Sequence, residues 1–335
     1  MIVLAGRPAR HRVPPQAAGL AAAGTIGLLA GLLGILVPVV GAPVFAVVAG
    51  VLLSPLARRF AWRVEVAKGP VLQLSVVLLG AQLSLGEVLS VGAGSLPVML
   101  GTLGVCLLLA AVVGRRLGVP RDLRTLIGVG TGICGASAIA ATTPAIRAKS
   151  NDVAYAISTI FLFNVAAVLI FPPLGHLLGL GQHAFGLFAG TAVNDTSSVV
   201  AAAGAYGPAA VRYAVVVKLV RTLMIIPIVL FLSARSARPA GSARSARVLS
   251  LVPWFLVAFV AVAGLHSAGL IPVAAQGFLH QVALLFIAIA LAAVGLSTDV
   301  AALRRAGARP LLLGLILWIA VSVTSLGLQY VTHFA

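Results

Sequence analysis

The amino-acid sequence predicts an all-α membrane protein that crosses the bilayer about eleven times, with some of its helices broken. Three observations predict this fold class. The chain of 335 residues is 61% hydrophobic and only 9% charged, with a mean hydropathy of +1.15, which leaves too little polar surface for a soluble domain. Long intervals of the chain carry no charge, and the basic residues gather in short clusters between these intervals.

Length decides how the charge-free intervals divide into helices. A helix needs about 20 apolar residues to cross a hydrocarbon core ~30 Å thick, so the longer intervals each hold two spans that fold back at glycine and proline residues. The predicted spans are residues 18–37, 40–55, 69–86, 95–117, 124–146, 152–173, 183–204, 208–233, 250–269, 274–297 and 310–332.

The basic clusters orient these spans. The clusters lie at residues 7–12, 58–68, 115–124, 235–247 and 304–309, and all of them fall on the cytoplasmic side when the N-terminus is placed inside. We therefore expect a cytoplasmic N-terminus and a periplasmic or extracellular C-terminus.

A single polytopic domain is expected over residues 18–335, after a cytoplasmic tail over residues 1–17. The tail carries arginines as a signal peptide does, but the apolar stretch that follows runs on to residue 57 without a clear cleavage site, which predicts an uncleaved first span. Ser-Ala-Arg repeats over residues 234–248 predict a flexible cytoplasmic linker between the two halves of the domain.

The segment 128–141 (GVGTGICGASAIAA) predicts a broken helix. Each of its closely spaced glycines costs a helix about 1 kcal/mol relative to alanine. Unwound backbone is tolerated in a membrane only where it is buried in protein or lines a cavity. The N-terminus of a half-helix offers free N–H groups to an anion, so Thr131, Gly135, Ala136 and Ser137 are candidate ligands. The alternative is that these small residues only allow close helix packing.

Five polar residues follow one another inside the apolar segment 190–204. Four of them, Asn194, Asp195, Thr196 and Ser197, are candidates for a substrate or coupling-ion site, and Asp195 is the only acid placed well within a predicted span. The alternative is a short loop or a re-entrant tip at the membrane interface. The segment also resembles residues 130–137, with Gly-Thr and Ser at the same offsets.

Lys218 and Arg221 lie within the predicted span 208–233 and share one helix face, because they are three residues apart. Arg221 is roughly 20 Å along this helix at 1.5 Å per residue, too deep for its side chain to reach the interface easily. Buried charges cost roughly 3 kcal/mol each on insertion scales, which indicates a function. With Asp195 they leave a net positive site that favours an anion. The alternative is a structural bridge that neutralises Asp195.

These segments resemble a known family. The run GVGTGICGASAIAA, the run GTAVNDT with Asp195, and the pair Lys218 and Arg221 are similar to the YeiH-like family of bacterial inner-membrane proteins, commonly labelled sulfate exporters. The resemblance covers nearly the whole chain. It implies an inner-membrane protein with the broken, crossing helices of the cation:proton antiporter and anion transporter superfamily. The sequence leaves the oligomeric state open, and homodimers are common in that superfamily.

The leading hypothesis is a secondary transporter that exports a small, sulfate-like anion by alternating access. Lys218 and Arg221 would bind the anion with help from Gly135, Ala136 and Ser137, and Asp195 would tether the two cations in the empty site or carry a proton. The alternative is an antiporter of sodium or another cation against protons, in which Asp195 binds cation and proton in turn. One acid beside two cations makes a poor cation site, so the charge balance favours the anion.

Other classes of function find little support in the sequence. The net charge of +17 is spread over the loop clusters, so the expected partners are the lipid bilayer and a small anion and not a nucleic acid. No nucleotide-binding or triad motif is present, and the histidines lack metal-ligand spacing, so we expect no catalytic residues, no metal and no cofactor. Cys106 and Cys134 lie in apolar segments and do not indicate a disulfide.

Overall fold

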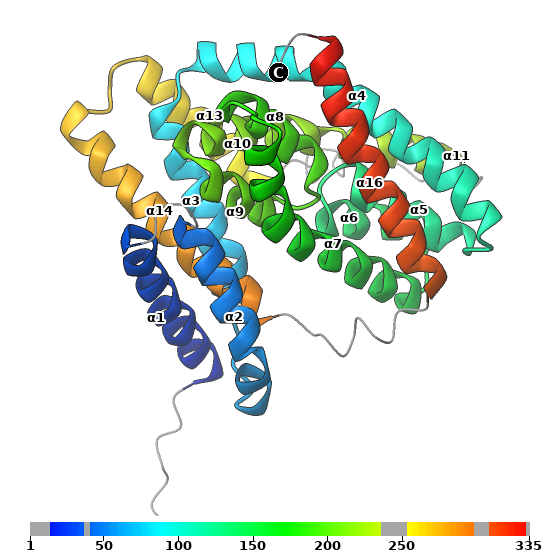
Figure 1. Ribbon diagram of the computed structural model, residues 1–335, viewed down its shortest axis with the longest axis horizontal. Coiled ribbons are helices and arrows are strands. Elements are labelled where there is room, and N and C mark those ends of the chain that lie inside the picture. Colours follow the sequence, from blue (N-terminus) through cyan, green and yellow to red (C-terminus); the bar gives the residue numbers. More distant parts are fainter. Residues whose placement is uncertain (1–13, 37–40, 236–252, 298–307, 333–335) are drawn as a thin grey trace, which may run out of the picture.

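The structure, a computed structural model, describes residues 14–36, 41–235, 253–297 and 308–332 (Figure 1). The described residues form helices joined by turns, without a strand among them, which confirms the predicted all-α class. The N-terminal tail before position 14 and most of the predicted linker 234–248 lie outside the described residues. In chain order the helices are α1 (Pro15–Leu36), α2 (Gly41–Arg59), η1 (Ala67–Val71), α3 (Leu72–Leu79), η2 (Gly80–Gln82), α4 (Leu85–Arg116), α5 (Arg121–Gly132), α6 (Ala136–Ile146), α7 (Ser150–Leu177), α8 (Gln182–Ala192), α9 (Thr196–Tyr206), α10 (Pro208–Leu223), α11 (Ile225–Arg235), α13 (Trp254–Ser267), α14 (Val273–Leu296) and α16 (Ala308–Val331).

Six helical segments of the described chain are long and apolar enough to cross a membrane. They are Pro15–Gly34, Leu85–Arg116, Ser150–Leu177, Pro208–Leu232, Val273–Leu296 and Ala308–Val331. Two of the other predicted spans, 124–146 and 183–204, are each occupied by a pair of half-helices.

Helix α4 begins ten residues earlier than the predicted span 95–117. Its start is set by a capping box: the Ser84 hydroxyl accepts from the Glu87 N–H at 3.1 Å, and the Glu87 carboxylate accepts from the Ser84 N–H at 2.8 Å. The predicted start at residue 95 rests on hydropathy alone. Hydropathy does not detect a polar capping box that begins a helix before its apolar stretch.

The helices form two groups (Figure 1). Helices α1, α2, α3, α13 and α14 pack against one another and form the first helix group. Helices α4 to α11 together with α16 form the second helix group, in which α8, α9 and α10 lie at the centre. The groups meet where α9 packs against α2 and α14.

Within the first helix group, α2 and α14 approach closely at two glycines. A Cβ atom on Gly50 would lie 2.4 Å from the carbonyl oxygen of Ala292, and one on Gly295 would lie 2.5 Å from the carbonyl oxygen of Val47. Small residues at such crossings let membrane helices pack backbone to backbone.

Gly50→Ala is expected to lower the free energy of unfolding by about 1–3 kcal/mol, because the added methyl group forces α2 and α14 apart. Thermal unfolding in detergent measures this change. The control is Gly31→Ala in α1, where an added Cβ meets no atom within 4 Å and alanine is the better helix former. Equal unfolding temperatures for Gly50→Ala and wild type would contradict close packing at this crossing.

Two helices of the second group are broken. Helix α5 ends at Gly132 and α6 begins at Ala136, which confirms the break predicted within residues 128–141. Helix α8 ends at Ala192 and α9 begins at Thr196, with extended backbone at Val193 and Asp195. The two breaks, at residues 133–135 and 193–195, stand at the same offset in the two similar sequence segments.

Candidate functional site

The two helix breaks lie next to each other in space. A Cβ atom on Gly135 would lie 3.2 Å from the Cβ of Asp195 and 3.6 Å from the carbonyl oxygen of Asn194. Gly135 has φ +70° and ψ −129°, a conformation that side-chain-bearing residues rarely adopt, so glycine is required both by the backbone and by the neighbouring chain.

Lys218 joins the two breaks from α10. Its side chain is fully buried, and its Nζ donates to the carbonyl oxygen of Ile133 and to that of Val193, each at 2.8 Å. One carbonyl belongs to each break. The ammonium group therefore stabilises both interrupted helices at once, because the last carbonyls of a helix have no partner within it and carry partial negative charge.

Arg221, one turn further along α10, also donates to backbone carbonyls at the ends of α5 and α8. Its guanidinium is also fully buried, and Nε donates to the carbonyl oxygen of Gly132 at 2.7 Å. Its two terminal nitrogens donate to the carbonyl oxygens of Thr131, at 3.3 Å, and of Thr191. Both cations thus lie at the C-terminal ends of α5 and α8, where positive charge is favourable.

Asp195 is occupied elsewhere, so the expectation that it tethers the two cations is wrong. Its Oδ1 accepts from the Ser198 N–H at 2.6 Å, as the N-cap of α9, and from the Ser197 hydroxyl at 3.1 Å. Its Oδ2 accepts from the Asn164 amide at 3.0 Å. Among the described residues, hydrogen bonds from neutral groups and not an ion pair hold this carboxylate.

A cavity of about 140 Å³ opens at the breaks, between the two helix groups. We call it the break cavity. It is lined by Lys68, Gly69, Leu72, Gln73, Val76, Cys134, Ala136, Ser137, Asp195, Thr196, Ser197 and Phe255. Five of the candidate residues from the sequence, namely Ala136, Ser137, Asp195, Thr196 and Ser197, therefore meet in one place. The volume is sufficient for a small inorganic ion with a few water molecules.

The N-termini of α6 and α9 both face the break cavity, because their first residues line it. No side chain caps α6, whereas Asp195 caps α9. The first N–H groups of a helix lack partners within it and carry partial positive charge. The positive N-terminal ends of α6 and α9 therefore face the cavity. The negative C-terminal ends of α5 and α8 are neutralised by Lys218 and Arg221.

The remaining candidates lie behind the cavity. Thr131, in the last turn of α5, and Gly135, in the first break, are both buried, and the Thr131 carbonyl accepts from Arg221. Asn194 is 1% exposed, and neither polar atom of its side-chain amide has a partner among the described residues. Lys218 donates to the backbone of the two breaks and Arg221 to the backbone at the ends of α5 and α8, and neither lines the cavity.

Three residues of the site escaped the sequence reasoning. Lys68, which had been assigned to a cytoplasmic basic cluster, lines the cavity with its ammonium 5.5 Å from the centre of the Phe161 ring. Gln73, at the start of α3, also lines the cavity. Asn164 connects the second break to α7, since it also accepts from the Asn194 N–H at 3.1 Å. A lone amide in the middle of an apolar span was the available signal for Asn164, whereas nothing in the local sequence distinguished Lys68.

No group of three or more His, Cys, Asp or Glu side chains suited to a metal ion occurs in the described ranges. Both cysteines are free and buried.

Comparison with known proteins places these features in a family. The sequence model of the family described as "Conserved hypothetical protein 698" matches residues 18–314. A UPF0324 membrane protein of Streptococcus pneumoniae is 44% identical over 328 residues, covering 93% of this chain and 96% of the relative. UPF0324 membrane proteins of Streptococcus agalactiae and Fusobacterium nucleatum are 41% and 39% identical, each over 89% of this chain and 92% of the relative.

Proposed function

The chain belongs to the conserved hypothetical protein 698 family and is a multi-pass membrane protein, and from that premise we propose that it is a secondary transporter for a small, sulfate-like anion. The observation that carries the proposal is the break cavity, into which two half-helix N-termini open while buried cations neutralise the opposite ends. A transporter needs no catalytic group, so the proposal assigns no enzymatic activity.

The charges around the breaks favour an anion. Lys68, Lys218 and Arg221 are basic and Asp195 is the single acid among them, so the four groups carry two net positive charges when all of them are ionised. The dipoles of α6 and α9 add to the positive potential within the cavity. The side-chain charges and the helix dipoles both attract an anion that enters the cavity, and both repel a cation.

The residues divide into two roles. The backbone N–H groups of Ser137, Thr196 and Ser197 and the hydroxyls of Ser137 and Thr196 are the proposed direct ligands, with Lys68 at the exposed mouth of the cavity. Lys218 and Arg221 contribute charge from behind, because most of their donors are already directed at backbone carbonyls. The sequence alone predicts Lys218 and Arg221 as the main ligands of the anion. In the structure-based proposal the N-termini of α6 and α9 are the main ligands instead.

The position of the cavity suits alternating access. Residues of η1, α3 and α13 line one side and residues of α6 and α9 line the other, so the first and second helix groups each contribute a wall. Movement of one group against the other would expose the ions in the cavity to either side of the membrane in turn.

The membrane arrangement is part of the proposal. It comprises about eleven crossings in the bacterial inner membrane, the N-terminus in the cytoplasm, and the helix arrangement of the cation:proton antiporter and anion transporter superfamily. In this orientation the basic cluster that contains Lys68 faces the cytoplasm, so the cavity is open inward. Export of each negative charge from an inside-negative cell gains about 2.3 kcal/mol per 100 mV.

One observation favours a second candidate, a cation:proton antiporter. The Asp195 carboxylate lines the break cavity beside the hydroxyl-bearing residues Thr196 and Ser197, and oxygen atoms of this kind are the ligands that hard cations prefer. In that function Asp195 would exchange a cation for a proton.

Transient currents on a solid-supported membrane distinguish the two functions. Proteoliposomes with the purified protein are expected to respond to jumps of sulfate and not to jumps of sodium. Lys68→Gln is expected to raise the half-saturating sulfate concentration about tenfold, the effect of losing one charge-assisted hydrogen bond. Lys149→Gln, at an exposed lysine outside the cavity, serves as the matched control and should leave it unchanged.

Asp195→Asn separates the candidates further, because asparagine caps a helix about as well as aspartate. Sulfate currents are expected to persist in this variant. Currents that arise only from sodium or pH jumps, and that vanish with Asp195→Asn, would replace the anion transporter with the antiporter.

A further inference from the structure

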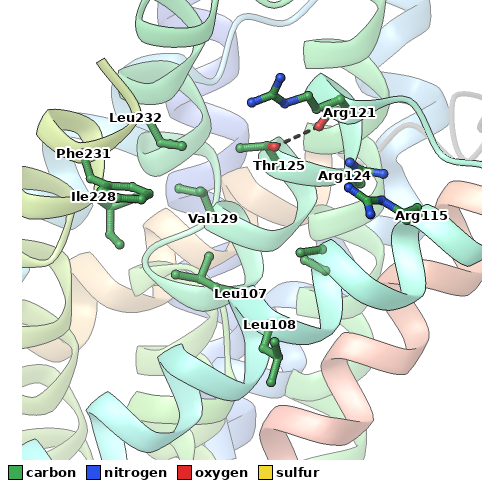
Figure 2. A pocket seen from close by; sticks show the side chains of 12 residues that line it. Leu107, Leu108, Arg115, Arg121, Arg124, Thr125, Val129, Ile228, Phe231 and Leu232 are labelled. Atoms are coloured by element: carbon green, nitrogen blue, oxygen red, sulfur yellow. Dashed lines mark hydrogen bonds between the residues drawn. The ribbon is translucent and has the colours of Figure 1, made fainter. Parts of the chain in front are cut away.

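A second and larger cavity, of about 530 Å³, lies at the outer edge of the second helix group, between α4, α5 and α11 (Figure 2). We call it the arginine groove. Arg115, Arg121 and Arg124 lie at one end, and the walls are built mainly from apolar side chains such as Leu108, Val129 and Ile228. It shares no lining residue with the break cavity.

The three arginines of the groove are close together in the chain and have no partner among the described residues. They come from the last turn of α4 and the first turn of α5, and none of their guanidinium groups has a hydrogen-bond or ion-pair partner in the described chain. Asp122, the acid nearest to them in the sequence, does not line the groove. Guanidinium groups bind phosphate through paired N–H donors, so three arginines without a partner in the described chain, all lining one groove, are suited to hold a phosphate group.

The apolar walls continue from the arginines into the depth of the membrane. Leu108 precedes Arg115 by seven residues of α4, and Val129 follows Arg121 by eight residues of α5, which places them about 10 Å and 12 Å along their helices. One leaflet of the hydrocarbon core is roughly 15 Å thick. A molecule with its phosphate at the arginines would thus lay its apolar part along most of one leaflet.

The groove opens sideways, toward the position of the lipid. Leu108 is 63% exposed, and Arg115, Arg121 and the neighbouring Ala111 are exposed as well. The chain that continues beyond α11 carries further arginines, at positions 238, 244 and 247. This segment is positively charged like the groove, so its charge does not suit it as the occupant.

We propose that the arginine groove binds an anionic phospholipid, with the lipid phosphate between the three arginines and an acyl chain along Leu108, Val129 and Ile228. A basic pocket between helices on the cytoplasmic side is a recurring way to bind anionic head groups. The bound lipid would hold α11 against α4 and α5, and α5 is the half-helix whose far end forms the first break. The proposal does not depend on which ion the break cavity carries.

Native mass spectrometry of the purified full-length protein tests this site, with dioleoyl phosphatidylglycerol as the probe and dioleoyl phosphatidylethanolamine as the neutral counterpart. The wild type is expected to retain phosphatidylglycerol selectively. The double variant Arg121→Gln/Arg124→Gln should weaken retention about twenty-five-fold, since each lost arginine accounts for about fivefold. Arg116→Gln is the matched control, because Arg116 is exposed in the same turn of α4 but does not line the groove.

A second pair of variants tests the acyl-chain part. Ala111→Trp fills the groove and should reduce retention without any change of charge, whereas Val112→Trp, at an exposed neighbour outside the groove, should not. Equal retention of both lipids, or equal loss in Arg116→Gln and the double variant, would overturn the proposal. Full protection of the wild type against thermal unfolding by inorganic phosphate alone would also overturn it if the Arg121→Gln/Arg124→Gln variant lost that protection, because the groove would then be a site for a free anion.

Discussion

Replacing Lys218 by methionine is expected to lower the free energy of unfolding by about 3–5 kcal/mol and to abolish transport. The substitution leaves the carbonyl oxygens of Ile133 and Val193 without their donor, and an unsatisfied buried acceptor costs about 1–3 kcal/mol. Relief from burying the ammonium offsets part of this loss. The offset is incomplete, because the negative ends of α5 and α8 then meet without the charge that holds them together.

Thermal and denaturant unfolding in detergent measure the stability of this variant. Lys149→Met removes the same type of charge at an exposed position and is expected to change stability by less than about 0.5 kcal/mol. A Lys218→Met protein as stable as the control would show that the breaks do not need the ammonium, and the role assigned to Lys218 would be wrong.

Gly135→Ala is expected to have the second largest effect, a loss of about 2–5 kcal/mol together with the loss of transport. The backbone at Gly135 lies in a region where an L-residue is strained by about 1–3 kcal/mol. The new methyl group would also meet the Asp195 side chain at 3.2 Å and displace the cap of α9, whose loss costs about 0.5–2 kcal/mol.

The control for this variant is Gly104→Ala in α4, where an added Cβ meets no atom within 4 Å and the helix gains a better helix former. Gly104→Ala should be as stable as the wild type or slightly more stable, with its sulfate currents intact. If Gly135→Ala kept wild-type stability and currents, the two breaks would not be coupled through this contact.

Much of the fold was predictable because membrane helices follow local rules. Apolar length and the absence of charge located the helices, and the glycines of residues 128–141 predicted the first break, since no strong helix former occupies its centre. The similar segment 190–197 contains the second break at the same offset. The start of α4 was misplaced by ten residues, because its capping box is a polar signal that hydropathy does not register.

The sequence predicted which residues belong to the candidate site, but it did not predict which partners they contact. Ser137, Asp195 and Lys218 stood out as polar or charged residues in apolar surroundings, where burial is costly and a partner is required. Their partners were not predictable. Lys218 donates to backbone carbonyls. Every residue carries such an acceptor, so the sequence does not show which residues are the partners of Lys218.

The residue pattern was enough to predict a helical membrane protein, a helix that breaks among glycines, and buried charges in the neighbouring apolar segments. These properties follow from composition and from interactions between residues close together in the chain. Helix packing, in contrast, sets the contacts of the site: Asp195 caps α9 and does not pair with Lys218, and Lys68 lines the same cavity as Ser137. The physical reason is that such contacts join residues tens of positions apart, through helix packing that no local pattern encodes.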